Sequence, residues 1–398
     1  KESTQMAKKK SDSDASKKKF NPESAMADLT ESTGMQSFTE SKYITPEDYL
    51  DTGCYALNRI ISGNVNNGFP MGYLTLISGP SQGGKSYYAA RGINSALKKG
   101  FKAVFIFDTE GGSVNGLIDD KFDKSKIKQI LVPNADTAIV YMQKILDFIS
   151  DYQEHDESAR FLIVFDSIGG LRAKKLAEDA ASGVNVQDVG STPRKIGDLL
   201  TLMTIPCLKT HTPAIILSHT YESFSMTPTK VMPTYGGSKV LYLPSVSILT
   251  RSTPRKADKM TGEIDAETFY AGSEFTFFTF KNRFVRPFFE AKTMNNFLSG
   301  EDKYFGLFTV AEGYELIVRN GSMYRIPEYS GDKNWYAKDI LSGKESEEIW
   351  DKLIPIINEK SIVDMAYGSA TKSPGELSDA KSVRSEIESD STDHMISS

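Results

Sequence analysis

Short apolar runs recur along the chain between residues 73 and 292, each bounded by Gly, Pro or polar residues. Four of them are apolar at nearly every position, which is typical of strands buried on both faces. These strand candidates are 73–78, 102–108, 161–166 and 213–218. Segments with a helical pattern lie between or beside them, at 85–98, 136–151 and 193–208. Buried strands that alternate with helices predict an α/β fold with a doubly wound, mainly parallel sheet and helices on both faces.

The pattern changes after residue 240. Three strand candidates follow with little helix between them, at 241–250, 274–281 and 287–292, so we expect antiparallel hairpins to extend the sheet. From residue 301 to residue 367 helix and strand patterns are mixed, and a small C-terminal α/β domain is predicted there. Residues 37–300 would then form the core.

Both ends of the chain have compositions that are typical of disorder. Residues 1–20 contain seven lysines against three acidic residues and very little apolar surface to bury. We therefore expect a basic, disordered N-terminal tail over 1–36, with a short helix near 23–31. Residues 371–398 hold six acidic residues against three basic ones and are rich in serine, which predicts an acidic, disordered tail over 368–398.

Bulk composition narrows the class of protein. The formal net charge of −5 means that any surface for nucleic acid must be local. The two cysteines, Cys54 and Cys207, have no motif spacing, which suits a reducing compartment. The sequence shows no apolar run of membrane-spanning length and no apolar signal segment. We therefore expect a cytoplasmic protein without a membrane partner.

The most specific motif follows the first strand candidate. It is Gly79, Pro80, Ser81, Gln82, Gly83, Gly84, Lys85 and Ser86, which matches the phosphate-loop pattern G-x-x-x-x-G-K-S. In such a loop the backbone N–H groups surround phosphate oxygens, and the following helix adds partial positive charge. Lys85 would reach the β- and γ-phosphates, and the Ser86 hydroxyl would hold Mg²⁺. A Gly-rich turn without a ligand is the alternative, but the position between a strand and a helix favours a nucleotide site.

Two carboxylates stand at the ends of neighbouring strand candidates. Asp166 ends the most apolar run, at the sheet edge where open α/β folds bind ligands, and could orient the hydration shell of Mg²⁺. Glu110 follows the run 102–108 and could act as a general base toward water. The alternatives are a turn-capping aspartate and a solvated glutamate.

His219 and the segment after it form another candidate site. The histidine follows the run 213–218, at the same edge, and the segment 220–240 is too rich in Pro and Gly for a helix. A histidine bonded to a backbone carbonyl is the structural alternative. If His219 instead contacts the γ-phosphate, the segment after it becomes a nucleotide-gated element.

Together these segments resemble the RecA-type DNA strand-exchange recombinases, most closely the branch of T-even-like bacteriophages. The resemblance runs from about residue 51 to about residue 367. It rests on six segments in a fixed order: GFPMGYLTLISGP, the phosphate loop, FDTEGG, LIVFDSIGGL, ILSHTYE and FKNRFVRPF. His219 favours the phage branch, because bacterial RecA has glutamine at the corresponding place. The resemblance implies a RecA-like P-loop ATPase core.

The resemblance also implies roles for individual residues. Glu110 would be the catalytic glutamate, acting with Lys85 and His219, while Asp166 and Ser86 serve Mg²⁺ and Tyr87 continues the nucleotide site. Lys281 and Arg283 would reach the ATP of a neighbouring protomer, although the residues alone favour a solvated strand end. Segments 172–195 and 220–240 would be two DNA-binding loops. The candidate contacts are Arg172, Lys174, Lys175, Arg194, Lys195, Tyr221, Phe224, Met226, Lys230, Gly236, Gly237 and Lys239.

The implied activity is that of a DNA-dependent ATPase, with ATP and Mg²⁺, which forms a helical filament on single-stranded DNA and exchanges strands with double-stranded DNA. In a phage-infected bacterial cell this would serve recombination, repair and recombination-dependent replication, with a single-strand-binding protein and a mediator or loader as partners. Three alternatives share the fold: a hexameric helicase, a regulatory ATPase without DNA contact, and a non-hydrolysing mediator. Only about fifty residues precede the core, fewer than the N-terminal scaffold domain that a helicase would need.

Overall fold

The computed structural model describes residues 21–37, 41, 43–112, 116–182, 190–220, 235–256, 270–296 and 300–367. The chain divides into two units, Lys1–Thr45 and Pro46–Ser398. The first contains helix α1 (Pro22–Thr33), which includes the helix expected at 23–31. The Asn21 side chain caps it by accepting a hydrogen bond from the Glu23 N–H, and Gly34 ends it in the left-handed conformation.

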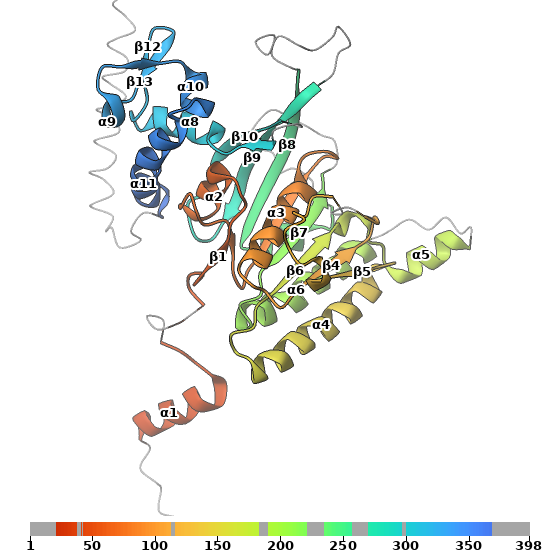
Figure 1. Cartoon of the computed structure of the whole chain (residues 1–398). Coiled ribbons are helices and arrows are strands. Elements are labelled where there is room, and N and C mark those ends of the chain that lie inside the picture. The colour runs from red at the N-terminus through yellow and green to blue at the C-terminus, as the bar shows by residue number, and fades with distance from the viewer. Residues whose placement is uncertain are drawn as a thin grey trace, which may run out of the picture. The chain divides into compact units, whose positions relative to one another are not determined.

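A nine-stranded sheet forms the centre of the second unit (Figure 1). Its strands are β3 (Leu74–Gly79), β4 (Ala103–Asp108), β5 (Ile127–Leu131), β6 (Phe161–Asp166), β7 (Ala214–His219), β8 (Val246–Lys256), β9 (Tyr270–Asn282), β10 (Glu290–Asn296) and β11 (Gly300–Asp302). They lie in the order β11-β10-β9-β8-β3-β7-β6-β4-β5. Six neighbouring strands run parallel to one another: β8, β3, β7, β6, β4 and β5. Beyond β8, the strands β9, β10 and β11 each run antiparallel to the strand before them. The predicted RecA-like core, a mainly parallel sheet between helices, is confirmed.

Two details of the sheet differ from the prediction. The expected strand 241–250 was wrong at its start: residues Ser238–Tyr242 form helix α7, and β8 begins at Val246 and runs parallel to β3. Gly237, at φ +81°, permits the sharp change of direction that starts α7. Strand β5 was not predicted at all. Its residues are partly or fully exposed at the edge of the sheet, so the apolar pattern that marks the central strands is absent.

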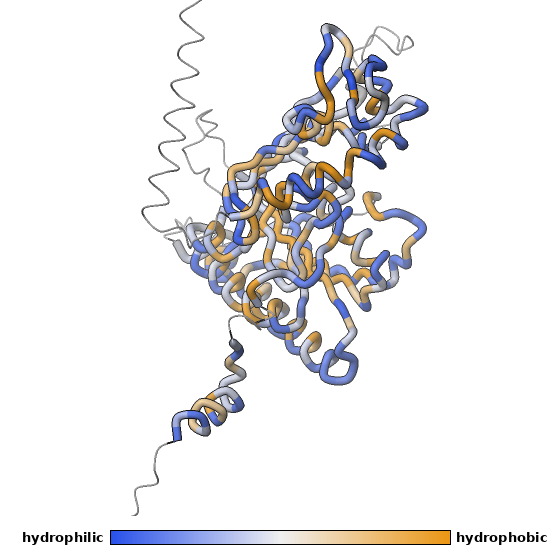
Figure 2. Tube along the Cα trace, turned by 90° about the vertical axis from the view of Figure 1, so that its left-hand side faces the viewer, coloured by the Kyte–Doolittle hydropathy of each residue, from blue (hydrophilic) through white to orange (hydrophobic). Residues whose placement is uncertain are grey.

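Helices cover both faces of the sheet, because alternate strand residues point to opposite sides. Helices α2 (Tyr55–Ser62) and α3 (Lys85–Lys98) pack on one face, against Ile77, Val104 and Leu162 among others. Helices α4 (Ala135–His155) and α6 (Ser191–Lys209) pack on the other, with residues such as Leu76, Phe105 and Phe161. Figure 2 shows these hydrophobic segments enclosed by more polar turns and outer helix faces. Burying each such side chain contributes about 1.5–3 kcal/mol.

A third apolar cluster lies in the C-terminal part, around the fully buried Trp350, which stacks on Tyr304 at 5.0 Å between ring centroids. Its elements are α8 (Phe305–Gly313), β12 (Val318–Asn320), β13 (Met323–Arg325), α9 (Pro327–Ser330), β14 (Asn334–Trp335), α10 (Ala337–Ser342) and α11 (Ser346–Met365). The remaining short elements are β1 (Tyr49–Leu50), β2 (Phe69–Pro70), α5 (Lys174–Ala181) and two 3₁₀ turns, Lys124–Lys126 and Ile168–Gly170. Among the described residues, every helix is too short or too polar to cross a bilayer.

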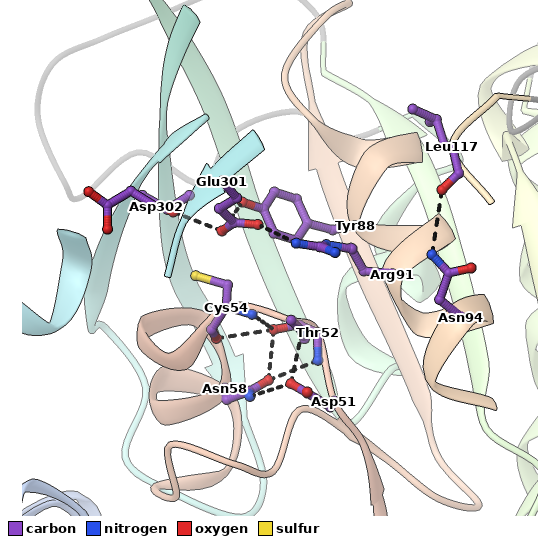
Figure 3. A network of polar contacts seen from close by, with 12 residues as sticks. Asp51, Thr52, Cys54, Asn58, Tyr88, Arg91, Asn94, Leu117, Glu301 and Asp302 are labelled. Atoms are coloured by element: carbon purple, nitrogen blue, oxygen red, sulfur yellow. Dashed lines mark hydrogen bonds and ion pairs between the residues drawn. The ribbon is translucent and has the colours of Figure 1, made fainter. Parts of the chain in front are cut away.

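A buried carboxylate anchors helix α3, which begins at Lys85. Figure 3 shows Glu301 of β11 turned toward Tyr88 and Arg91 of this helix. Its Oε1 accepts hydrogen bonds from the Tyr88 hydroxyl at 2.9 Å and the Thr293 hydroxyl at 2.8 Å, and Oε2 pairs with Arg91 at 3.4 Å. Burial raises the pKa of Glu301, although these donors act in the opposite direction. The start of α3 is therefore held by its packing on the sheet and by polar contacts to β10 and β11.

Candidate active site

The predicted phosphate loop connects β3 to α3 and has no room for larger residues at its glycines. Gly84 caps α3 at φ +85°, and a Cβ atom there would lie 2.8 Å from the ring of Phe275. A Cβ on Gly79 would lie 2.4 Å from the Thr250 carbonyl oxygen. The Thr250 hydroxyl also donates to the Gly83 carbonyl at 2.6 Å. Strands β8 and β9 thus fix the outer side of the loop.

Lys85 points into the curve of its own loop. Its Nζ donates to the carbonyl oxygens of Gly79 at 3.0 Å and Pro80 at 2.7 Å, and the residue is 7% exposed. Burial lowers the pKa of Lys85, while Asp166 and Glu110 favour its charged form. A buried cation beside the backbone N–H groups of a Gly-rich loop fits a phosphate group.

Ser86 and Asp166 meet where α3 begins and β6 ends. The Ser86 hydroxyl donates to Asp166 Oδ2 at 3.0 Å, and Asp166 is 3% exposed. A hydroxyl paired with a carboxylate beside a phosphate loop is an oxygen donor set that suits Mg²⁺. The residues present therefore fit the predicted metal ion.

Glu110, Ser167 and His219 form a hydrogen-bonded group at the carboxyl edge of the sheet. Glu110 Oε1 lies 2.8 Å from His219 Nε2 and accepts a hydrogen bond from the Ser167 hydroxyl at 2.7 Å. Burial raises the pKa of Glu110, but the contacts with His219 and Ser167 outweigh it, so the net pKa is lowered. Glu110 is therefore ionised at neutral pH, with 43% of its side chain exposed. The solvated-glutamate alternative accounts for the exposure but not for the two partners.

Sequence reasoning missed Ser167 and Gly169, which complete this group. Ser167 follows Asp166 directly, but only the folded chain brings it to Glu110. A Cβ on Gly169 would lie 2.7 Å from the imidazole of His219, so the glycine makes space for the ring. The sequence did contain a signal, since Ser167, Gly169 and Gly170 follow directly on the strand that carries the proposed Asp166 site.

The segment expected to bind DNA starts after His219, and Tyr235 near its other end contacts the same histidine. His219 ends β7 in register with Gly79, the first residue of the phosphate loop. The Tyr235 N–H donates to the His219 carbonyl at 3.3 Å, and the Tyr235 hydroxyl donates to the Leu171 carbonyl at 2.8 Å. The chain that leaves at His219 therefore returns to it. The predicted contacts Tyr221, Phe224, Met226 and Lys230 lie outside the described residues.

The other predicted DNA contacts lie near α5, α6 and α7. Several of the lysines have acidic partners: Lys195 with Asp136 at 2.7 Å, Lys239 with Asp198 at 3.4 Å and Lys174 with Glu178 at 3.7 Å. Gly236 and Gly237 pack on α6, where a Cβ would meet Ile196 or Pro193. Arg172, Lys175 and Arg194 are exposed. Tyr235 thus lies beside Leu171, and Gly236 and Gly237 lie beside α6. The two DNA-binding loops and their individual contacts stay predictions.

Lys281 and Arg283 lie away from the phosphate loop of their own chain. Lys281 pairs with Ser247 and Ser247 with Leu76, which places Lys281 about 10 Å from Gly79 along the strand direction. Both side chains donate to the Tyr242 carbonyl oxygen. Burial, with a further contribution from the Arg283 charge, lowers the pKa of Lys281 to about 8.

A cavity of about 260 Å³ adjoins the phosphate loop. It is lined by Gln82, Gly83, Gly84, Lys85, Ser86, Tyr87, Phe275 and Asn295. The rings of Tyr87 and Phe275 stack there, with centroids 6.3 Å apart. Tyr87, predicted to continue the nucleotide site, therefore borders the space next to the loop.

A mainly parallel sheet, a phosphate loop after β3, and acidic and imidazole groups at the ends of β4, β6 and β7 define a RecA-like P-loop protein. No family model matches the chain. It is 25% identical over 316 residues to the recombination and repair protein of Enterobacteria phage T4, covering 78% of this chain and 72% of that protein. It is also 25% identical over 326 residues to the RecA protein of Mycoplasma mobile, covering 79% and 89%.

A third relative is the mitochondrial DNA repair protein recA homolog 3 of Arabidopsis thaliana. It is 26% identical over 407 aligned positions, which cover 97% of this chain and 87% of the relative. These similarities confirm the resemblance to RecA-type recombinases, and the phage T4 protein is one of the T-even branch that the sequence resembles.

Proposed function

We propose that this protein is an ATP-dependent DNA recombinase, which assembles as a helical filament on single-stranded DNA and catalyses homologous pairing and strand exchange. Its role would be phage recombination, repair and recombination-dependent replication in the cytoplasm of an infected bacterial cell. The recombination and repair activities named for its relatives support this assignment. Residues 301–367 would form a small C-terminal domain, and 1–36 and 368–398 the two tails.

One observation carries the proposal: a single hydrogen bond joins the proposed general base to the residue from which the proposed DNA-binding segment starts. Glu110 Oε1 and His219 Nε2 are 2.8 Å apart, and the chain after His219 returns to the same residue at Tyr235. A nucleotide that changes the partners of His219 would therefore act on that segment through the main chain.

Four residues of the chain would each have a different role in ATP hydrolysis. Lys85 would exchange the carbonyls of Gly79 and Pro80 for phosphate oxygens and offset the charge that develops during transfer. Glu110, ionised at neutral pH because its pKa is lowered, would accept the proton of the attacking water. Ser86 and Asp166 would hold Mg²⁺, which when bound neutralises charge on the β- and γ-phosphates.

Assembly would complete this site. Lys281 and Arg283 lie toward the opposite edge of the sheet from Gly79, so they cannot serve the phosphate loop of their own chain. Their two cations would instead reach the triphosphate bound by a neighbouring protomer, which places ATP at the subunit interface. The Tyr242 carbonyl, which both side chains contact, would be released in that exchange.

The DNA partner would be bound by the segments after Asp166 and after His219. The exposed cations there would contact phosphates, and aromatic residues of 220–234 would stack on bases. A single-strand-binding protein and a mediator or loader are proposed as further partners.

Electron microscopy of the chain with single-stranded DNA and a slowly hydrolysed ATP analogue tests the proposal. We expect continuous helical filaments with the analogue and short or absent ones with ADP. Closed rings would indicate a hexameric helicase, and no DNA-bound particles would indicate a regulatory ATPase. A strand-exchange assay with homologous duplex DNA separates a recombinase from a filament that only mediates loading.

A further inference from the structure

Asp108 lies beneath the loop that carries Glu110 and accepts four hydrogen bonds. It is 1% exposed. Its Oδ1 accepts from the backbone N–H groups of Glu110 at 2.9 Å and Gly111 at 2.6 Å, and Oδ2 accepts from Gly112 N–H at 3.0 Å. The fourth donor is Gln129 Nε2, at 2.6 Å from Oδ2. Burial opposes the charged carboxylate, but these donors outweigh it and lower the pKa of Asp108.

On the strand side of this loop, Thr109 is fixed by hydrogen bonds to Asp166 and Ser167. The residues after Thr109 depend more on Asp108. Gly111 and Gly112 follow Glu110 directly and adopt φ values of +82° and +80°. Two glycines in succession have wide conformational freedom, and a Cβ at either would have no atom within 4 Å, so packing does not restrain them. The three N–H bonds to Asp108 therefore hold the backbone from Glu110 to Gly112, beyond the contacts of Thr109, and with it the position from which the Glu110 side chain extends.

Gln129 comes from β5, the strand at the edge of the sheet beyond β4. It is exposed, so it does not serve the core, and its register partner on β4 is Ile106, two residues before Asp108. Its amide reaches along the strand to Oδ2 of Asp108. The Glu110 and Gly111 N–H groups bind Oδ1 of Asp108, and the Gln129 amide binds Oδ2 from a second strand. Gln129 therefore fixes the orientation of the Asp108 carboxylate.

We infer that Asp108 and Gln129 are positioning residues for Glu110, with the edge strand β5 setting the geometry of the proposed general base. This inference rests on the proposed ATP hydrolysis only for the role of Glu110. Neither residue touches the phosphate loop, whose lysine and serine bind Gly79, Pro80 and Asp166. Their loss should therefore act on the chemical step and not on nucleotide binding.

Steady-state hydrolysis with single-stranded DNA supplies the first test. Gln129→Leu should lower kcat about 10-fold and leave the KM for ATP within about 2-fold, because a small displacement of a reacting group is costly. Gln129→Glu should be worse, since it places a second carboxylate against Asp108. Adding Asp108→Asn to Gln129→Glu should restore part of that loss, because the new amide can donate to the new carboxylate. Lys128→Gln, on the same strand with its Nζ on the Ser125 carbonyl, is the control and should match the wild type.

Amide hydrogen exchange of the full-length chain without nucleotide supplies a second test that needs no activity. The amides of Glu110, Gly111 and Gly112 should exchange faster in Gln129→Leu than in the wild type, while those of α3 keep their rates. Unchanged exchange at these amides would overturn the inference. The inference would also be wrong if the decreases in kcat caused by Asp108→Asn and by Gln129→Glu simply add in the double variant. A wild-type chain that hydrolyses no ATP would refute the proposed function instead, and the exchange rates would still decide the inference.

Discussion

The imidazole Nε2 of His219 lies 2.8 Å from the carboxylate Oε1 of Glu110. His219 ends β7 and Glu110 lies two residues after the end of β4, with β6 between the two strands. Glu110 is ionised, so His219 donates and Glu110 accepts. In the proposed function, an arriving γ-phosphate would offer His219 another acceptor. This pair would then have two arrangements, one for each nucleotide state.

Replacing His219 tests whether this pair couples ATP to DNA. His219→Ala should still bind ATP, but it should bind single-stranded DNA equally weakly with an ATP analogue and with ADP, and DNA should no longer stimulate hydrolysis. A coupling free energy of about 1–3 kcal/mol would disappear. DNA affinity in both nucleotide states at fixed salt is the measurement. His155→Gln, at the exposed end of α4, is the control. If the alanine variant keeps the wild-type difference, the coupling does not pass through His219.

Glu110→Gln separates binding from chemistry. The amide keeps the shape of the side chain but cannot take a proton, so nucleotide binding should persist while turnover falls about 10²–10⁴-fold. Lys85→Ala should abolish hydrolysis, since it removes the cation that faces the transferred phosphate. Single-turnover hydrolysis and binding of a fluorescent ATP analogue measure the two effects, with Glu157→Gln as a surface control. Near-normal turnover in Glu110→Gln would show that Glu110 is a solvated glutamate and not the general base.

Alanine at both Lys281 and Arg283 tests assembly. Monomer nucleotide binding should remain close to the wild type, because neither side chain approaches the phosphate loop of its own chain. Filament length and DNA-stimulated hydrolysis should both collapse, since the interface loses two cations opposite the triphosphate. Lys292→Ala, an exposed lysine on β10, provides the control. Long filaments from the double variant would place both residues on a solvated strand end.

The lowered pKa of Lys281 gives assembly a dependence on pH. The group loses its charge as pH rises through about 8 in the free chain, whereas an unperturbed lysine would do so at 10.5. A bound triphosphate favours the charged form, so assembly should take up a proton and weaken between pH 7 and 9. Light scattering with an ATP analogue at constant ionic strength measures this. Lys281→Arg stays charged throughout the range, and the pH dependence should vanish in it. The same dependence in that variant would place the titrating group elsewhere.

The local part of the site could be predicted from sequence. The phosphate loop needs only its own residues and a strand and helix beside it, and Asp166 needs only the end of a buried strand. Asp108 and Ser167 could not be assigned in this way, because their partners depend on the register of β4 against β6 and on β5 being present at all. Strand β5 escaped prediction since an edge strand need not be apolar on both faces.

Further along the chain, β9 and β10 followed the expectation of antiparallel strands, whereas β11 was not predicted and 241–250 forms a strand only from Val246. Leu241 and Tyr242 read as strand residues by composition, yet Gly236 and Gly237 before them open a short helix that packs on α6. Contacts between distant segments overrode local preference there.

The hydrogen bond from Tyr235 N–H to the His219 carbonyl brings together the two ends of the segment between these residues. That segment therefore starts and returns at one place in the fold. Its composition and length can change during evolution, or by exchange with the matching segment of a relative, while the ends stay where the sheet places them. If the segment binds DNA as proposed, we expect differences in nucleic-acid preference between such relatives to arise in it, without changes in the proposed ATP-hydrolysing residues.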